Sequence, residues 1–127
     1  LGDTEAQCNL GLMYYLGNGV QQDYIQAREW WLKSAENGYS QAQYNLGVMY
    51  ENGEGVTQDY IEAAKWYTEA AENGYAPAQY NLGKMYADGL GVKQDYTEAV
   101  RYYRLAAQQD SEDAKKALEE LGETWQH

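Results

Sequence analysis

The chain has 127 residues, a formal net charge of −11, one cysteine and one histidine. Such an acidic chain lacks the basic surface that attracts nucleic acids and anionic membranes, so we expect neither as a partner. A single cysteine excludes an intrachain disulfide, and no apolar run is long enough to insert into a bilayer. We expect a soluble protein, and the sequence leaves its compartment open between the cytoplasm, the periplasm and the outside of the cell.

A unit of 36 residues repeats along the chain. Shifting the sequence by 36 superimposes Ala6, Ala42, Ala78 and Ala114, then Leu10, Leu46, Leu82 and Leu118, then Asp23, Asp59 and Asp95. A period of about 20–50 residues is typical of solenoids, whose units must stack to bury their apolar faces. We expect one domain over residues 1–127, with repeats at 3–38, 39–74 and 75–110 and a partial repeat, a capping helix, at 111–127.

The first helix of each repeat is predicted from apolar residues on one helical face. In the second repeat this helix covers about residues 41–52, with apolar residues at i, i+4, i+7 and i+8. They are Ala42, Leu46, Met49 and Tyr50. The pairs Ser40 with Gln43 and Thr4 with Gln7 are expected to form capping boxes. Pro77 is expected at a first helical position, where its missing N–H costs nothing.

The second helix of the second repeat is predicted over about residues 60–73. Its aromatic pair, Trp66 and Tyr67, is expected to fill the core between small alanines. Asp59 should cap the N-terminus, with Glu62 as the reciprocal partner of the capping box. Gly74 should end the helix in a left-handed conformation.

The loop between the two helices contains Gly53 and Gly55, which indicate backbone angles that other residues resist, with Val56 tucked under the turn. The partial repeat begins with a capping residue, Ser111, and continues as an apolar stripe opposite charged residues. The stripe consists of Ala114, Ala117, Leu118, Leu121 and Trp125. One apolar and one polar face are expected of a helix that ends a repeat array.

The pattern of residues that recurs in each unit resembles the Sel-1-like repeat (SLR). The residues that carry the resemblance are Ala42, Leu46, Gly47, Tyr50, Gly53, Gly55, Val56, Asp59, Ala63, Trp66, Ala70, Ala71 and Gly74. The resemblance implies a right-handed α-solenoid, related to tetratricopeptide arrays, whose first helices line a concave side. It also implies an adaptor or scaffold that holds other proteins. A cysteine-rich subgroup of the family has been linked to β-lactam binding, but this chain lacks the paired cysteines of that subgroup.

The candidate binding residues are those of the first helices that the predicted core does not use. On the concave face we expect them to form rows across the repeats. They are Cys8, Asn9, Leu12, Tyr15 and Leu16 in the first repeat, Gln41, Tyr44, Asn45, Val48, Glu51 and Asn52 in the second, and Tyr80, Asn81, Lys84 and Asp88 in the third.

One asparagine recurs in every repeat, as Asn9, Asn45 and Asn81. Because asparagine is a mediocre helix former, another interaction must favour it at this position. One interpretation is a hydrogen bond to the loop of the neighbouring hairpin. The other is an amide that grips the backbone of a bound partner.

Few residues of the chain suggest chemistry. His127 is the last residue and is interpreted as a chain end, and no histidine lies near Cys8 in sequence to activate its thiol. No ligand spacing for a metal recurs, and the glycine loops lack the lysine of a phosphate-binding loop. We therefore expect no enzyme, no cofactor and no metal.

The function predicted from these features is an adaptor that binds a peptide or protein on the concave face. A basic partner is the natural complement of the charge of −11, although the charge could instead serve solubility alone. The alternatives are a purely structural or engineered repeat scaffold and, less favoured, a small-ligand binder or enzyme.

The N-terminal end of the array is expected to be incomplete. Residues 1–3 align with the end of a second helix, which suggests an excised fragment or a mature chain. Without a preceding hairpin, the apolar residues of the first helix should be only partly covered: Leu10, Leu12, Met13, Tyr14, Tyr15 and Leu16. This patch predicts self-association through the first repeat, or another hairpin there, with a monomer whose first helix frays as the alternative.

Overall fold

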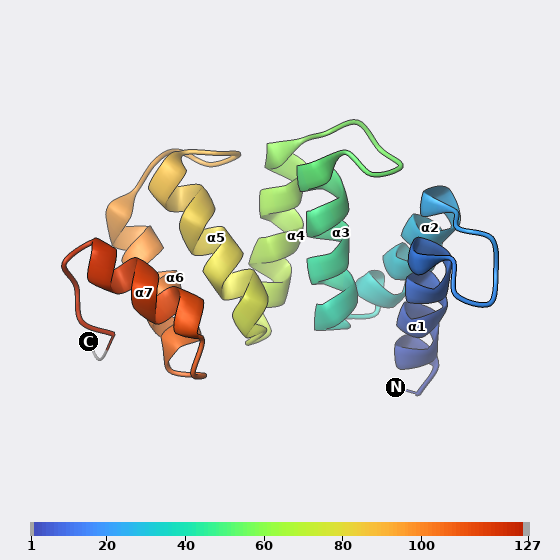
Figure 1. The fold of residues 1–127 in the computed structure, drawn as a ribbon, viewed down its shortest axis with the longest axis horizontal. Coiled ribbons are helices and arrows are strands. Elements are labelled where there is room, and N and C mark those ends of the chain that lie inside the picture. Colours follow the sequence, from blue (N-terminus) through green and yellow to red (C-terminus); the bar gives the residue numbers. More distant parts are fainter. Residues whose placement is uncertain (1, 126–127) are drawn as a thin grey trace.

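The computed structural model describes residues 2–125, and these residues form seven α-helices and no β-strand. The helices pair into hairpins that follow one another along a single row (Figure 1). Their bounds are α1 (Gly2–Leu16), α2 (Tyr24–Glu36), α3 (Ser40–Asn52), α4 (Tyr60–Glu72), α5 (Ala76–Asp88), α6 (Tyr96–Ala107) and α7 (Glu112–Glu120). The predicted all-α solenoid is confirmed.

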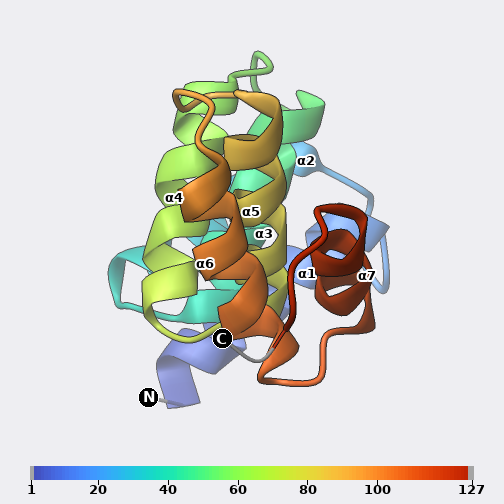
Figure 2. The same cartoon turned by 90° about the vertical axis from the view of Figure 1, so that its left-hand side faces the viewer.

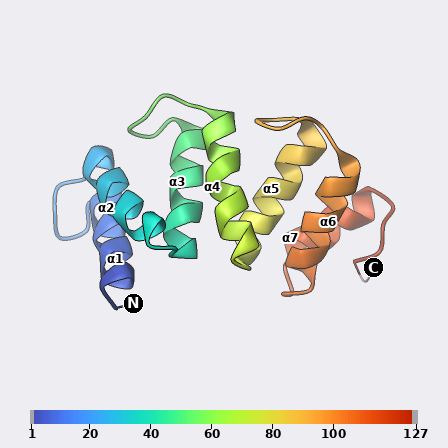
Figure 3. The ribbon, with the colours of Figure 1, turned by 180° about the vertical axis from the view of Figure 1, so that it is seen from behind.

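The odd-numbered and even-numbered helices form two layers. In the side view α4 and α6 lie on one side of the molecule and α1 and α7 on the other (Figure 2). Seen from behind, α6 lies in front of α7, the reverse of the first view (Figure 3). We call the surface formed by α1, α3, α5 and α7 the odd-helix face.

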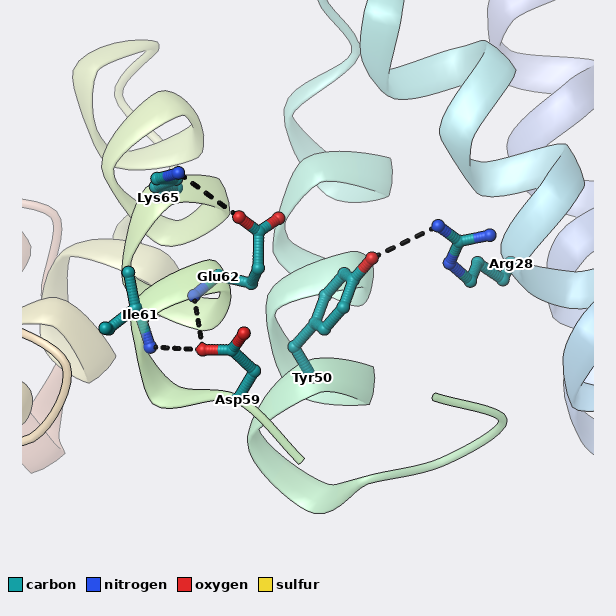
Figure 4. A network of polar contacts seen from close by, with 6 residues as sticks. All are labelled: Arg28, Tyr50, Asp59, Ile61, Glu62 and Lys65. Atoms are coloured by element: carbon teal, nitrogen blue, oxygen red, sulfur yellow. Dashed lines mark hydrogen bonds and ion pairs between the residues drawn. The ribbon is translucent and has the colours of Figure 1, made fainter. Parts of the chain in front are cut away.

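The second helices begin as the sequence predicts, with an aspartate cap. Asp59 accepts hydrogen bonds from the backbone N–H groups of Ile61 and Glu62 at 3.0 and 3.2 Å (Figure 4). The predicted reciprocal bond from Glu62 is wrong. The backbone N–H of Asp59 donates to the carbonyl of Tyr50 instead, and the Glu62 carboxylate pairs with Lys65 at 3.3 Å.

The capping boxes predicted for the first helices are also wrong. Ser40 is already helical, and Tyr39 caps α3 without a side-chain hydrogen bond; Thr4 likewise lies inside α1. Pro77 is the second residue of α5 rather than the first. A proline is still tolerated there, because the first four N–H groups of a helix have no intrahelical acceptor.

Gln43, from one of the predicted boxes, and its equivalent Gln79 instead join adjacent repeats. Gln43 is buried, and its amide donates to the carbonyl of Ala35 in the preceding hairpin at 3.1 Å. The same amide accepts from Asn73 Nδ2 at 3.1 Å. Gln79 repeats the arrangement one repeat later, with the Ala71 carbonyl at 3.2 Å. A buried amide needs both kinds of partner, and the neighbouring repeat supplies the acceptor that a capping box does not.

A large aromatic residue on each second helix packs against a glycine of the first helix. Tyr67 is 0% exposed, and a Cβ added to Gly47 would lie 2.5 Å from its ring. Gly83 and Tyr103 repeat this contact. Trp66 is only half-buried at the edge of the core, which corrects the expectation that it belongs to the core on equal terms with Tyr67. The glycine lies opposite only one of the two aromatic positions.

We predict that Tyr67→Ala lowers the free energy of unfolding by about 3–5 kcal/mol, the usual cost of truncating a buried large aromatic residue. Trp66→Ala should cost clearly less, because part of the indole already contacts solvent. Urea denaturation of the two variants measures both values. Equal losses would contradict the conclusion that Tyr67, and not Trp66, fills the space beside Gly47.

The loops of the hairpins require glycine at one position. Gly55 has a φ of +71°, as the sequence predicts, and a Cβ there would lie 2.8 Å from the Cβ of Tyr24. Gly91 has a φ of +73° and would meet the backbone of Tyr60. The loops of the second and third repeats therefore rest on the start of the second helix of the preceding repeat, and a side chain at Gly55 or Gly91 would push the repeats apart.

We predict that Gly55→Ala destabilises the protein more than Gly74→Ala does. Gly74 also has a positive φ, of +86°, but a Cβ there would meet nothing within 4 Å. The pair therefore separates backbone strain, which both variants suffer, from the clash between repeats, which only Gly55→Ala suffers. Thermal unfolding measures the difference, and equal melting temperatures would contradict the clash.

The C-terminal helix α7 closes the array. Ala114 and Leu118 are fully buried against α6, and Ser111 caps the helix by accepting from the backbone N–H of Ala114. Leu121, predicted to continue the apolar stripe, is instead exposed and caps the helix C-terminus. The helix has ended there, so the periodicity no longer carries its side chain to the core.

Candidate protein-interaction surface

Two adjoining hollows lie on the odd-helix face. The larger, of about 430 Å³, is lined from α3, α5 and the start of α7. The smaller, of about 130 Å³, lies between the C-terminal halves of α3 and α5. Both are lined by Asn81, so we treat them together as one groove. The lining includes Tyr44, Pro77, Tyr80, Glu112 and Asp113 in the larger hollow and Glu51, Lys84, Asp88 and Leu90 in the smaller.

The tyrosines of the groove are held by ring contacts with the core. The Tyr44 ring lies 5.6 Å from that of Tyr67 and 5.4 Å from that of Tyr75, and the Tyr80 ring lies 5.8 Å from that of Tyr103. Burial raises the pKa of Tyr44. Its hydroxyl therefore stays neutral and serves as a hydrogen-bonding group at the groove wall.

The recurring asparagines link adjacent repeats. The side chain of Asn81 lies beside the hydroxyl groups of Tyr44 and Tyr67 in the preceding repeat and lowers the pKa of both, against the larger effect of burial. Asn45 Nδ2 lies 3.9 Å from the Sγ of Cys8. Of the two interpretations, these contacts support the hydrogen bond between repeats, but its partners lie on helices and not in a loop. Asn9, in the first repeat, is exposed.

Acidic side chains on this face accept hydrogen bonds from tyrosines. The hydroxyl of Tyr67 donates to Glu51 at 2.6 Å, and burial together with this bond raises the pKa of Tyr67 well above its usual value. Tyr15 donates to Glu54 at 2.9 Å, and burial, more than this bond, raises the pKa of Tyr15 to about 12. Glu51 therefore stabilises the fold as well as lining the groove.

Cys8 does not belong to the accessible surface. It is 3% exposed, and burial raises the pKa of its thiol to about 11. A neutral, buried thiol is a poor nucleophile. Val48 is half-buried and packs against the core, and it is not among the residues that line the groove.

The other predicted residues lie in the groove, on α1 or elsewhere on α3. Six of them line the groove: Tyr44, Glu51, Tyr80, Asn81, Lys84 and Asp88. Leu12, Tyr15 and Leu16 lie on α1, away from the groove, and Gln41 and Asn52 are exposed elsewhere on α3. Sequence reasoning missed Glu112 and Asp113; the signal was available, because the 36-residue period places α7 in the same layer as the first helices.

Within residues 2–125 no group of three or more histidine, cysteine, aspartate or glutamate side chains is arranged to hold a metal ion. His127 lies outside the described residues. In that same part of the chain, no helix has the length and apolar character needed to cross a bilayer.

Several residues of α1 are more exposed than the equivalent residues of α3 and α5. Met13 is 36% exposed, whereas its equivalents Met49 and Met85 are 0% and 3% exposed. Leu10 is half-buried, although its counterparts in α3 and α5 are fully buried. The buried Oε1 of Gln7 also lacks a hydrogen-bond partner. In the other repeats the equivalent Oε1 atoms accept from the end of their own repeat, from Asn73 Nδ2 for Gln43 and from Gln109 Nε2 for Gln79. The Nε2 atoms of Gln43 and Gln79 donate to the second helix of the preceding repeat, which the first repeat lacks among the described residues.

Stacked two-helix repeats with these loops define an α-solenoid built from one repeating unit. The Sel1 repeat family matches residues 4–39, 40–75 and 76–111, and the chain belongs to this family. Sel1 repeats form scaffolds that commonly serve protein interaction. A comparison with curated proteins gave no match.

Solved structures of related proteins share the fold. A protective antigen of uropathogenic Escherichia coli strains, which displays an SLR fold, is 43% identical over 98% of this chain, with a TM-score of 0.92. This chain spans only 28% of that protein. A Sel1 repeat protein from Oxalobacter formigenes is 41% identical, with 94% and 90% of the two chains covered and a TM-score of 0.88. Cysteine rich protein B of Helicobacter pylori is 27% identical, with 91% and 89% covered and a TM-score of 0.78.

Proposed function

We propose that this protein is an interaction module that binds a peptide or protein segment in the groove of the odd-helix face. The observation that supports this most is the meeting of the two hollows at Asn81, beside Tyr44 and Tyr80, whose rings are held by contacts with other tyrosines. Aromatic side chains with restricted motion give large contact area at low entropic cost, as binding surfaces require.

Variation between repeats supports binding over a purely structural role. The position of the groove residue Lys84 differs from copy to copy, since its equivalents are Leu12 and Val48, while the leucines Leu10, Leu46 and Leu82 of the same helices are identical. Packing therefore does not fix this position, and it is available for recognition. A structural or engineered scaffold would bind no segment there, and this difference separates the two functions.

We predict that peptides selected from a random library by the intact protein bind at the groove. Tyr80→Ala should weaken them about tenfold, within the range for losing one interface aromatic residue. Tyr96→Ala, on α6, is the matched control because Tyr96 is an exposed tyrosine on the other layer. Circular dichroism should show both variants folded.

If no peptide is selected, the result favours the alternative that the protein is a structural scaffold. If the selected peptides respond equally to Tyr80→Ala and Tyr96→Ala, they bind elsewhere, and the groove is not the site.

The apolar residues that α1 leaves partly or largely exposed are Leu10, Leu12, Met13 and Leu16, and we call them the α1 stripe. This stripe supports a second interaction, with another copy of the chain. Within residues 2–125 every second helix is already used, because α2 packs on α3, α4 on α5 and α6 on α7. A symmetric contact between two α1 stripes is therefore the arrangement that this chain can supply by itself. Leu12 and Leu16, which are 40% and 59% exposed, add apolar area on the same helix.

We predict a concentration-dependent dimer that Met13→Glu disperses, because the charge would enter the apolar contact. Ile61→Glu is the control, since Ile61 is 60% exposed and lies on α4 in the second repeat, whereas Met13 lies on α1 in the first. Light scattering over a range of concentrations measures the mass. A monomer at every concentration, with α1 well ordered, would rule this association out.

A further inference from the structure

The groove carries acidic side chains at both ends. Glu112 and Asp113 line the larger hollow beside Pro77, and Glu51 and Asp88 line the smaller. Among the described residues neither Asp88 nor Asp113 forms an ion pair, since the pairs found involve other carboxylates. Two unneutralised carboxylates therefore flank a wall of Tyr80 and Asn81.

The length of α5 sets the distance between these ends. Pro77 and Asp88 are eleven positions apart on this one helix, and a rise of 1.5 Å per residue separates them by about 16 Å. An extended chain advances about 3.3 Å per residue. Because alternate side chains of an extended chain point to opposite faces, two side chains that both face the groove are an even number of positions apart. Four positions advance the backbone by about 13 Å, and long side chains cover the rest of the distance.

A lysine of the protein itself already lies in the smaller hollow. The Lys84 ammonium group is 5.6 Å from the centroid of the Tyr80 ring, and no carboxylate pairs with it among the described residues. The contact shows that this wall accommodates an ammonium group by a cation–π interaction. The same positive charge opposes the entry of another cation near Asp88.

We propose that the groove binds an extended segment with two lysine or arginine residues four positions apart, one facing Asp113 and the other Asp88. This inference rests on the proposed function and names its partner by charge and spacing. Complementary charges at fixed separation select a register as well as a sign. Lys84 then moderates affinity, because it competes with one of the two cations.

The test uses the intact protein and fluorescently labelled peptides of one composition, glycine and serine with two arginines, measured by fluorescence anisotropy. The arginines are placed at i and i+2, i and i+4, or i and i+8, so that both lie on the same face of an extended peptide. The i, i+4 peptide should bind about threefold more tightly than the others, because only it satisfies both ends. Asp88→Asn and Asp113→Asn should each remove about that factor.

Two further variants make the test specific. Lys84→Met should tighten binding of the i, i+4 peptide, a gain that general damage to the fold cannot produce. Glu29→Gln, at an exposed position on α2, changes the net charge as Asp88→Asn does and should leave binding unchanged.

Equal affinity for all three spacings, or an equal response to Glu29→Gln and Asp88→Asn, would mean unspecific attraction to the charge of −11 and would overturn the proposal. If no basic peptide binds while a library-selected peptide still depends on Tyr80, this inference fails and the proposed function stands. If neither class of peptide binds, both fail.

Discussion

The architecture depends on the contact between a glycine of each first helix and an aromatic residue of the second. Gly11 faces Trp31, Gly47 faces Tyr67 and Gly83 faces Tyr103, and a Cβ at any of these glycines would collide with the ring. The ring takes the space of the missing side chain, so the two helices approach closely. Each hairpin thereby acquires a fixed internal geometry, and only hairpins of equal geometry can stack in register.

Stacking then combines apolar packing with directional polar contacts. The buried side-chain amides of Gln43 and Gln79 donate hydrogen bonds to carbonyl groups of the preceding hairpin. The loop glycine Gly55 lies so close to Tyr24 that a side chain there would collide with it. These contacts are directional, so a slipped register would leave amides buried without partners. They also lie away from the outer part of the odd-helix face, which leaves that face free to vary.

A recognition groove arises only where repeats meet. Its walls come from α3, α5 and α7, so no isolated hairpin contains it. Glu51 and Asn81 both line the groove and hold tyrosines of the fold, so binding and stability share residues there. The acidic ends instead consist of side chains that the fold does not use, as Asp88 and Asp113 show.

The sequence by itself determined the period, the helices, the aspartate caps and the glycine conformation in the loops. Each of these depends on residues within one repeat: Asp59 caps with its own next residues, and Gly55 needs its positive φ whatever surrounds it. Six of the predicted binding residues also line the groove, since helical periodicity decides which face a side chain occupies.

Only the tertiary structure decided which partners those residues meet. Gln43 binds the preceding repeat instead of its own cap, Trp66 lies at the edge of the core, and Cys8 is buried. Glu112 and Asp113 complete the groove although they belong to the capping helix. These outcomes depend on how close one hairpin lies to the next, and that distance follows from packing between segments about 36 residues apart, which a local pattern does not encode.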